Sequence, residues 1–328
     1  MNVAVLGAGA WGTAMAISLA RRHSVSLWAR DPAQREAMCA ARANSRYLPG
    51  FSFPDGLEIA DDPGAALTAA DLALVAVTTA GLRETLRRMR ATHATAPSVW
   101  LCKGFEPGAA KLPHQVFEEE LGAGARCAVL SGPSFAEEVA RGLPTAVTLA
   151  SRDITFSRDT ARALHSPTFR VYSSDDLLGV EVAGAVKNVM AIAAGICDGL
   201  GYGHNARAAL ITRGLAEITR LGVELGGRAE TFMGLAGAGD LILTCTGDLS
   251  RNRRVGLALG QGKALDTILA ELGHVAEGVS TARELERMAE RLGVNMPVTN
   301  AVCRVLADHT QASAAADALL QREPRAER

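Results

Sequence analysis

The chain has 328 residues, and its 34 Lys and Arg side chains nearly balance its 35 Asp and Glu side chains. At about 100 to 200 residues per domain, this length predicts two domains, each large enough to bury its own core. The near-zero net charge gives no support for a nucleic-acid-binding surface or a polybasic membrane patch, and a composition that is 48% hydrophobic but only 4% aromatic is typical of a soluble α/β protein.

Up to residue 173, short runs rich in Val, Leu and Ala alternate with helical patterns, as they do in β-α-β units. Several runs are apolar at nearly every position, which is expected of parallel strands that helices cover on both faces. These features predict a doubly wound sheet in a first domain at residues 1–175. The predicted strands are Asn2–Leu6, Ser24–Trp28, Leu72–Val77, Val99–Cys102, Cys127–Leu130, Ala146–Leu149 and Phe169–Tyr172.

A G-x-G-x-x-G motif, Gly7-Ala8-Gly9-Ala10-Trp11-Gly12, follows the first predicted strand directly and precedes a helical pattern. In this context the first glycine permits a tight turn, the second lets the backbone approach a pyrophosphate, and the third lets helix and strand pack closely. The N-terminus of the helix then faces the anion. We therefore expect a Rossmann-like domain that binds a dinucleotide; the alternative is a glycine turn without a ligand.

The second predicted strand is followed by Arg30 and Asp31, where an NADP site places an arginine and an NAD site a carboxylate. Arg30 would pair with the 2′-phosphate of NADPH. Asp31 precedes Pro32, so its alternative role is to cap the next helix. We expect NADPH to be preferred and NADH to be usable.

Further polar groups follow later strands, at the carboxyl edge where open α/β sheets bind ligands. Lys103 follows the strand at 99–102 and is one of only four lysines in the chain; a ligand contact and a plain loop lysine are both open. In the segment 131–138, we expect Ser134 to cap a helix, with Glu137 closing the capping box. Gly132 and Ser134 would also present a backbone amide and a hydroxyl at the ligand edge.

After residue 173 long helical patterns take over, beginning with Asp175–Cys197 and Ala206–Leu225. They predict a mainly α-helical second domain at residues 176–328, with Ser173, Ser174 and Asp175 as the N-cap at the junction. The most apolar stretch, 180–200, is interrupted by charged side chains, so no integral membrane segment is expected.

Lys187 lies inside this apolar helical pattern, with Asn188 beside it. Burying an ammonium group is costly without a purpose. A desolvated lysine, however, exchanges a proton near neutral pH, which arginine cannot do. Lys187 is therefore the candidate acid/base, and a lysine that snorkels out of a core-facing helix is the alternative.

Asp240 is the single carboxylate in the apolar segment 234–246. We expect it to pair with a cation such as Lys187, and capping of the following helix is the alternative. Thr244 lies one turn further along, on the same helix face. The run Ser250–Arg254 is locally basic, which is typical of solvated arginines but also of a site where arginine forks grip a phosphate.

The six cysteines are far apart, with no C-x-x-C pair and no Cys/His cluster at zinc spacing, which argues against a disulfide framework and a bound metal. The N-terminus has no charged segment followed by an apolar run and a cleavage site. We therefore expect a protein of the reducing cytoplasm.

Taken in order, these motifs resemble the bacterial NAD(P)-dependent glycerol-3-phosphate dehydrogenases. The resemblance implies reversible hydride transfer between NAD(P)H and dihydroxyacetone phosphate, giving sn-glycerol 3-phosphate for phospholipid synthesis, and it implies a homodimer. It spans nearly the whole chain through Gly7–Ala14, Lys103-Gly104, Ser131–Glu138, Glu181–Asn188, Asn205–Gly214, Gly234–Thr246 and Ser250–Arg254.

The resemblance also implies roles for individual residues. Lys187 would donate the proton to the ketone, Asp240 would orient Lys187, and Lys103 would help to polarise the substrate. The remaining substrate contacts would be Gly132, Ser134, Asn188 and Thr244, with Ser250, Arg251 and Asn252 at the phosphate. The cofactor contacts would be Gly7, Gly9, Ala10, Trp11, Gly12, Arg30, Lys103, Ala136, Arg251, Val275 and Glu277. Ala10 stands where the family usually has Ser.

Two rival functions remain at this stage. One is another two-domain reductase with a catalytic lysine, such as a hydroxyisobutyrate, 6-phosphogluconate or ketopantoate enzyme; the basic run 250–254 favours a phosphorylated substrate instead. The other is a nicotinamide sensor without catalysis, against which the presence of both Lys187 and Asp240 weighs.

Overall fold

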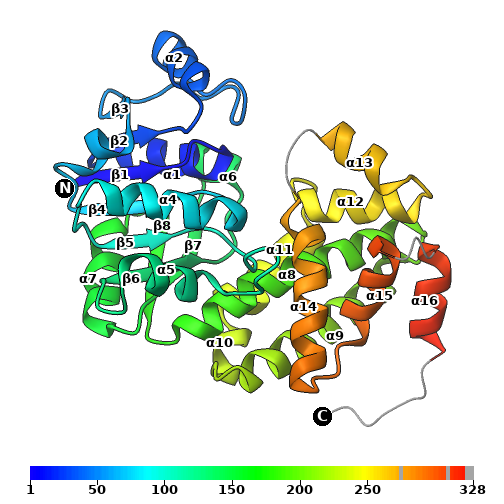
Figure 1. Ribbon diagram of the computed structural model, residues 1–328. Coiled ribbons are helices and arrows are strands. Elements are labelled where there is room, and N and C mark those ends of the chain that lie inside the picture. The colour runs from blue at the N-terminus through cyan, green and yellow to red at the C-terminus, as the bar shows by residue number, and fades with distance from the viewer. Residues whose placement is uncertain (273–275, 308–310, 322–328) are drawn as a thin grey trace. The chain divides into compact units, whose positions relative to one another are not determined.

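A computed structural model describes residues 1–272, 276–307 and 311–321. These residues form two compact units, which are coloured from blue through green and from green to red in Figure 1. The N-terminal unit comprises Met1–Glu106 and Lys111–Glu181, and the C-terminal unit comprises Pro107–Ala110 and the chain from Val182 onward. The division falls inside helix α8 (Leu177–Gly199).

An eight-stranded sheet forms the centre of the N-terminal unit, with the strand order β3-β2-β1-β4-β5-β6-β7-β8. The first six strands have the order 3-2-1-4-5-6 of a dinucleotide-binding sheet. In such a sheet the strands are added to one side of β1 up to β3 and to its other side from β4 onward, so the topological switch point lies between β1 and β4. Neighbouring strands in the described sheet run parallel, apart from the antiparallel pair β6 and β7. The strands are β1 (Asn2–Leu6), β2 (Ser24–Trp28), β3 (Leu57–Ile59), β4 (Leu72–Val75), β5 (Ser98–Trp100), β6 (Cys127–Ser131), β7 (Thr145–Ala150) and β8 (Phe169–Ser174).

The doubly wound fold predicted from the sequence is confirmed, and β1 and β2 have the predicted bounds. Strand β3 was missed because its three residues include the exposed Glu58 and form no apolar run, whereas the equally short β5 is buried throughout. The parallel direction expected of the buried runs is wrong between β6 and β7. Strand β7 begins with alternating buried and half-buried residues, a pattern that antiparallel strands show.

Helices cover the sheet and bury their apolar faces against it. Helix α1 packs against α6, and α4 against α5. Trp100 of β5 and Phe117 of α5 are both almost fully buried, with ring centroids 5.3 Å apart. The helices of this unit are α1 (Ala10–Ala20), α2 (Pro32–Ala41), α3 (Pro63–Leu67), α4 (Thr79–Ala91), α5 (Pro113–Leu121), α6 (Ala136–Arg141) and α7 (Ile154–Leu164).

The C-terminal unit is built from helices, as the sequence predicted. Its elements after α8 are α9 (Gly203–Glu224), α10 (Ala229–Met233), the π-helical turn η1 (Leu235–Gly239), α11 (Asp240–Thr246), α12 (Arg251–Gly260), α13 (Leu265–Leu272), α14 (Glu277–Leu292), α15 (Pro297–Ala307) and α16 (Ala312–Leu320).

Helix α8 is the core helix of the C-terminal unit. It is long and apolar enough to cross a membrane by length and composition, but 94% of its most apolar 18-residue window is buried inside the protein. That burial is typical of a core helix, so the described residues contain no clear membrane-spanning segment. The N-cap expected at Ser173–Asp175 is wrong by one residue: Asp176 Oδ1 accepts a hydrogen bond from the Gly179 backbone N–H at 2.9 Å, and Ser174 Oγ accepts from the Asp176 N–H.

Candidate active site

The glycine-rich turn joins β1 to α1 and lies beside the end of β4, where the strand order reverses. Gly7 has a φ of +116°, and a Cβ built on it would lie 2.4 Å from the carbonyl oxygen of Ala76. A Cβ on Gly12 would lie 2.0 Å from the carbonyl oxygen of Gly7, whereas one on Gly9 would meet nothing within 4 Å. The fold itself therefore requires Gly7 and Gly12, while Gly9 leaves open space beside the backbone, as a pyrophosphate site needs.

The start of α1 offers uncapped backbone donors. Gly9 is the N-cap, and no side chain caps this end of the helix. The backbone N–H groups of the first turn, including those of Ala10 and Trp11, therefore have no side-chain cap. Such a helix start attracts an anion through these N–H groups and the helix dipole. A Ser in place of Ala10 would add a hydroxyl but would leave these backbone donors unchanged.

Two amide side chains that the sequence analysis missed hold the turn in place. Asn44 Nδ2 donates to the Ala8 carbonyl at 2.9 Å and to Thr13 Oγ1 at 2.8 Å, and Gln34 Nε2 donates to the same carbonyl at 2.8 Å. Both reach back to the turn from more than 20 residues along the chain. Asn44 is only 1% exposed in the fold. No local sequence pattern predicts such a contact, because the partners are far apart in the chain.

Arg30 and Asp31 have different roles at the end of β2. Asp31 is the N-cap of α2, and its side chain accepts a hydrogen bond from the Ala33 N–H at 3.1 Å. This is the capping alternative that the sequence left open. The Arg30 side chain is 72% exposed and lies 3.4 Å from Glu84 Oε2. The exposed guanidinium is thus the cation at the position where dinucleotide sheets contact the ribose.

The structure brings Lys103, Gly132 and Ser134 together at the carboxyl edge of β5 and β6. The Gly132 carbonyl accepts from Lys103 Nζ at 3.3 Å and from Ser134 Oγ at 2.9 Å. The cap predicted for Ser134 is therefore wrong: Phe135 is the N-cap of α6, no side chain caps it, and the serine hydroxyl turns to Gly132 instead. Ala136 begins α6 directly after this cluster.

Lys187 is paired as the sequence predicted. Its Nζ lies 2.5 Å from Asp240 Oδ1 and 2.8 Å from Thr244 Oγ1, and all three residues are buried. Thr244 in turn donates to the Asp240 backbone carbonyl at 2.6 Å, so the two residues share a helix face as expected. Asp240 Oδ1 contacts the ammonium group, so the alternative that Asp240 only caps a helix is wrong. The alternative that Lys187 extends to solvent is also wrong, because its side chain is buried.

The backbone around Asp240 is unusual. The π-helical turn η1 ends immediately before Asp240, and such turns are frequent at functional sites. Cys245 is buried in the same helix, and burial raises the pKa of its thiol to about 12. That thiol is therefore neutral at ordinary pH and adds no charge to the cluster of Lys187 and Asp240.

The N-terminus of α12 carries the predicted phosphate-binding run. Ser250 is the N-cap, and its side chain accepts from the Arg253 N–H at 3.3 Å. Arg251 is exposed, whereas Asn252 is buried and its Oδ1 accepts from the Gly278 N–H at 3.0 Å. Arg251 is thus an exposed cation in the first turn of α12, where the helix dipole also favours an anion.

Comparison with known proteins assigns these clusters to a family. Sequence models of NAD-dependent glycerol-3-phosphate dehydrogenase match residues 2–157 with the N-terminal part and residues 176–317 with the C-terminal part. Curated proteins named glycerol-3-phosphate dehydrogenase (NAD(P)+) include one from Thiobacillus denitrificans, 59% identical over 327 residues with 100% of each chain covered. Another, from Nitrosospira multiformis, is 58% identical over 331 residues and covers 100% of this chain and 99% of its own.

The chain belongs to the NAD-dependent glycerol-3-phosphate dehydrogenase family. The family resemblance inferred from the motifs is thereby confirmed. A solved structure agrees: the crystal structure of glycerol-3-phosphate dehydrogenase from Coxiella burnetii is 44% identical, has a TM-score of 0.93 and covers 98% of both chains.

The remaining residues that the family resemblance implied lie in several places. Trp11 is half-buried in the first turn of α1, and Asn188 is buried beside Lys187 in α8. Glu277 is the first residue of α14. Val275 lies outside the described residues.

The sequence did not predict a buried hydrogen-bonded pair between α5 and α8. His114 Nδ1 and its backbone N–H both contact the carboxylate of Glu181, which lies in the first turns of α8. Burial is the main reason that the pKa of Glu181 is raised. Glu181 is six residues before Lys187 on the same helix, so the contact fastens the start of α8 to α5. The sequence signal that could have predicted this contact is the position of Glu181 inside an apolar helical pattern.

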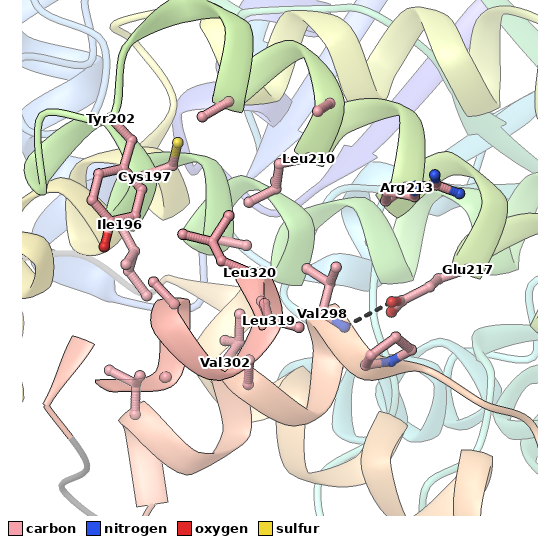
Figure 2. A pocket seen from close by; sticks show the side chains of 18 of the residues that line it. Ile196, Cys197, Tyr202, Leu210, Arg213, Glu217, Val298, Val302, Leu319 and Leu320 are labelled. Atoms are coloured by element: carbon pink, nitrogen blue, oxygen red, sulfur yellow. Dashed lines mark hydrogen bonds between the residues drawn. The ribbon is translucent and has the colours of Figure 1, made fainter. Parts of the chain in front are cut away.

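The C-terminal unit also has an apolar cavity of about 600 Å³ between α8, α9, α15 and α16. Figure 2 shows aliphatic side chains around it, with Glu217 at one end accepting a hydrogen bond from the Val298 backbone N–H. None of the site residues predicted from the sequence lines this cavity. It is therefore separate from the candidate active site of this dehydrogenase.

Proposed function

We propose that the protein catalyses the reversible reduction of dihydroxyacetone phosphate by NADPH or NADH, giving sn-glycerol 3-phosphate for phospholipid synthesis. The observation that carries the proposal is the buried Lys187–Asp240 pair in a chain whose full length matches proteins named for this reaction. Buried charge pairs contribute little net stability, so a chemical role accounts for this one better than a structural role does.

The glycine-rich turn supports binding of the dinucleotide. Its open side at Gly9 and the uncapped start of α1 fit a pyrophosphate, and both are made by backbone atoms. When bound, the reduced nicotinamide supplies the hydride for the ketone carbon. Trp11, Ala136 and Glu277 complete the cofactor contacts in this proposal, together with Lys103 and Arg251.

Lys187 is the proton donor. As the ketone is reduced, negative charge develops on its oxygen, and the Nζ ammonium stabilises this charge and transfers a proton to it. In the reverse reaction the neutral amine removes the proton from the alcohol. Asp240 keeps the side chain oriented and favours its protonated form, and the Thr244 hydroxyl fixes the second contact of Nζ.

Two further groups hold the substrate in this proposal. Arg251 grips the phosphate in a bidentate fork, helped by the Ser250 hydroxyl and by the Asn252 amide. Lys103, with Gly132 and Ser134, lies near the ketone and helps to polarise it, and Asn188 lines the site next to Lys187. Because the carbonyl of Gly132 already orients Lys103 and Ser134, these side chains are positioned before substrate arrives.

NADPH is the preferred cofactor in this proposal. The Arg30 guanidinium is exposed and only weakly engaged by Glu84, so it is available to a 2′-phosphate. In this proposal the Asp31 carboxylate caps α2 and does not bind a ribose. NADH lacks the phosphate but presents the same pyrophosphate and nicotinamide, so it remains usable.

A homodimer in the cytoplasm completes the proposal. Large apolar side chains are exposed on the C-terminal unit, including Val223, Met233 and Ile242, and a second copy would cover such groups. All six cysteines are free thiols, which suits a reducing compartment. Sedimentation equilibrium at micromolar concentration tests the dimer; a monomer mass would contradict it.

The reaction itself is tested by following NADPH and NADH absorbance with purified protein and dihydroxyacetone phosphate. Unphosphorylated dihydroxyacetone and ketopantoate serve as control substrates. Rapid oxidation with dihydroxyacetone phosphate alone is expected. Cofactor binding without turnover of any ketone would contradict the proposal and support a nicotinamide sensor, and turnover of ketopantoate alone would support the related reductases.

A further inference from the structure

Helices α8 and α12 are in backbone contact, which only glycine permits. A Cβ built on Gly195 of α8 would lie 2.1 Å from the carbonyl oxygen of Arg253. Gly199 and Gly260 face each other one turn further along, each with its built Cβ 2.9 Å from the other's Cα. Gly256, on α12, completes the contact. We call Gly195, Gly199, Gly256 and Gly260 the glycine seam.

The seam sets a register between the two helices. A Cβ on Gly256 would lie 2.0 Å from the carbonyl oxygen of Ile192, and one on Gly260 would lie 2.6 Å from that of Ile196. The contacts therefore advance by one turn on both helices together, so α8 and α12 run in the same direction here.

One turn before Ile192, the same register places Asn188 level with Asn252. Gly278 of α14 lies against both asparagines: a Cβ built on it would lie 2.6 Å from the Asn188 carbonyl oxygen and 2.9 Å from Asn252 Oδ1. Lys187 and Arg251 are the neighbours of these two asparagines. The seam thus fixes the proton donor of α8 against the phosphate-binding end of α12.

A half-buried ion pair joins the two helices beside the seam. Arg253 Nε, on α12, donates to Asp198 Oδ2 on α8 at 2.9 Å, and Nη2 lies 2.8 Å from the same oxygen. The side chains of Arg253 and Asp198 are each only 12% exposed. Arg207 of α9 donates to the other carboxylate oxygen, Oδ1, at 3.0 Å. The third guanidinium nitrogen of Arg253, Nη1, contacts Asp248, whose side chain is 96% exposed.

We propose that Asp198 and Arg253 are positioning residues for the reduction, which hold the phosphate-binding start of α12 at the correct distance from Lys187 through the glycine seam. The inference rests on the proposed function. A shift of α12 along α8 by about 1 Å misplaces the phosphate grip relative to the ammonium, and such errors reduce turnover steeply. Asp198 and Arg253 act through Arg251 and Lys187 rather than by touching the substrate.

The substitution Asp198→Asn tests this role, with Asp248→Asn as the matched control on the same arginine. In Asp198→Asn we expect kcat to fall by about tenfold, and the KM for dihydroxyacetone phosphate and the competitive inhibition constant of inorganic phosphate to rise together by about tenfold, with the KM for NADPH within about twofold. Asp248→Asn keeps all four constants within about twofold of the parent, because a solvated partner contributes little.

Parent-like values of the two phosphate-dependent constants in Asp198→Asn would overturn the inference, as would an equal rise in the KM for NADPH. If Asp198→Asn does not fold, Arg253→Lys tests the same link, because a single ammonium does not reproduce the two guanidinium nitrogens that contact Asp198. The same rise is expected, and its absence is equally decisive. A parent chain that does not reduce dihydroxyacetone phosphate would overturn the proposed function and this inference together; an active parent with unchanged variants overturns the inference alone.

Discussion

Lys187 Nζ lies 2.5 Å from Oδ1 of Asp240, and both side chains are buried. The two residues are 53 positions apart in the sequence and come from α8 and α11. A buried lysine without this carboxylate would lose its charge to desolvation. The pair therefore keeps an ammonium group in an apolar environment, where it is available as an acid.

Replacing Asp240 by Asn should lower turnover by about 100-fold or more and shift its alkaline limb to lower pH. The reason is that loss of the negative neighbour favours the neutral amine of Lys187. The measurement is kcat for dihydroxyacetone phosphate reduction across the neutral and alkaline range. Asp248→Asn, at an exposed position, is the control. An alkaline limb in Asp240→Asn that coincides with that of the parent would contradict the proposed role.

Two alanine substitutions separate the structural glycines of the turn from the ligand-facing one. Gly9→Ala should fold normally but weaken NADPH binding by about tenfold or more, because the new methyl group enters the space left for the pyrophosphate. Gly12→Ala should lower the melting temperature, because its Cβ would overlap the Gly7 carbonyl. Thermal unfolding and fluorescence titration with NADPH provide both readouts. Full NADPH affinity in a folded Gly9→Ala would place the cofactor elsewhere.

Arg30→Ala should raise the KM for NADPH by about tenfold and leave that for NADH within about twofold, because only NADPH has the 2′-phosphate. The initial rates with each cofactor at a fixed ketone concentration give the two constants. Arg162→Ala, which removes another exposed arginine on α7, should change neither. Equal effects of Arg30→Ala on the two cofactors would show that Arg30 does not read the phosphate.

Glu217 should make the stability of the protein depend on pH. Burial raises the pKa of this carboxyl above its ordinary value of 4.5, although it accepts hydrogen bonds from the Val298 and Thr299 N–H groups. Because the folded state holds the proton more tightly, the stabilisation is complete below pH 4.5 and is lost as pH rises through the raised pKa.

The substitution Glu217→Gln removes this titration. The free energy of unfolding of the parent, relative to that of the variant, should therefore fall as pH rises from about 4.5 toward neutrality. Urea unfolding at several pH values measures the difference, and Glu224→Gln, at an exposed position on the same helix, is the control. A difference that stays constant or grows with pH would show that the carboxyl titrates at or below its ordinary value.

The sequence predicted the features that repeat or that break a pattern. Strands β1 and β2, the turn at Gly7–Gly12 and the isolated charges Lys187 and Asp240 all belong to this class. Their signals are local, because an apolar run, a glycine spacing or a charge in an apolar helix is visible without a partner.

Features that depend on tertiary contacts were missed or wrong. Ser134 has the spacing of a cap, but its side chain is directed to the Gly132 carbonyl and α6 begins one residue later, after Phe135. Asn44 and the Glu181–His114 pair are ordinary polar residues until the fold brings their partners to them. The contact of Gly195 with α12 likewise arises only when two distant helices meet.

The most direct test of the account is the rate of hydride transfer in Lys187→Met, measured as single-turnover loss of NADPH absorbance with saturating dihydroxyacetone phosphate. Met fills the space of the lysine without a proton to give, and Lys187→Arg restores the charge but not the exchangeable proton. We expect both variants to bind NADPH like the parent and to transfer hydride at least about 1,000-fold more slowly. A rate within about threefold of the parent in Lys187→Met would contradict the assignment of Lys187 as the proton donor.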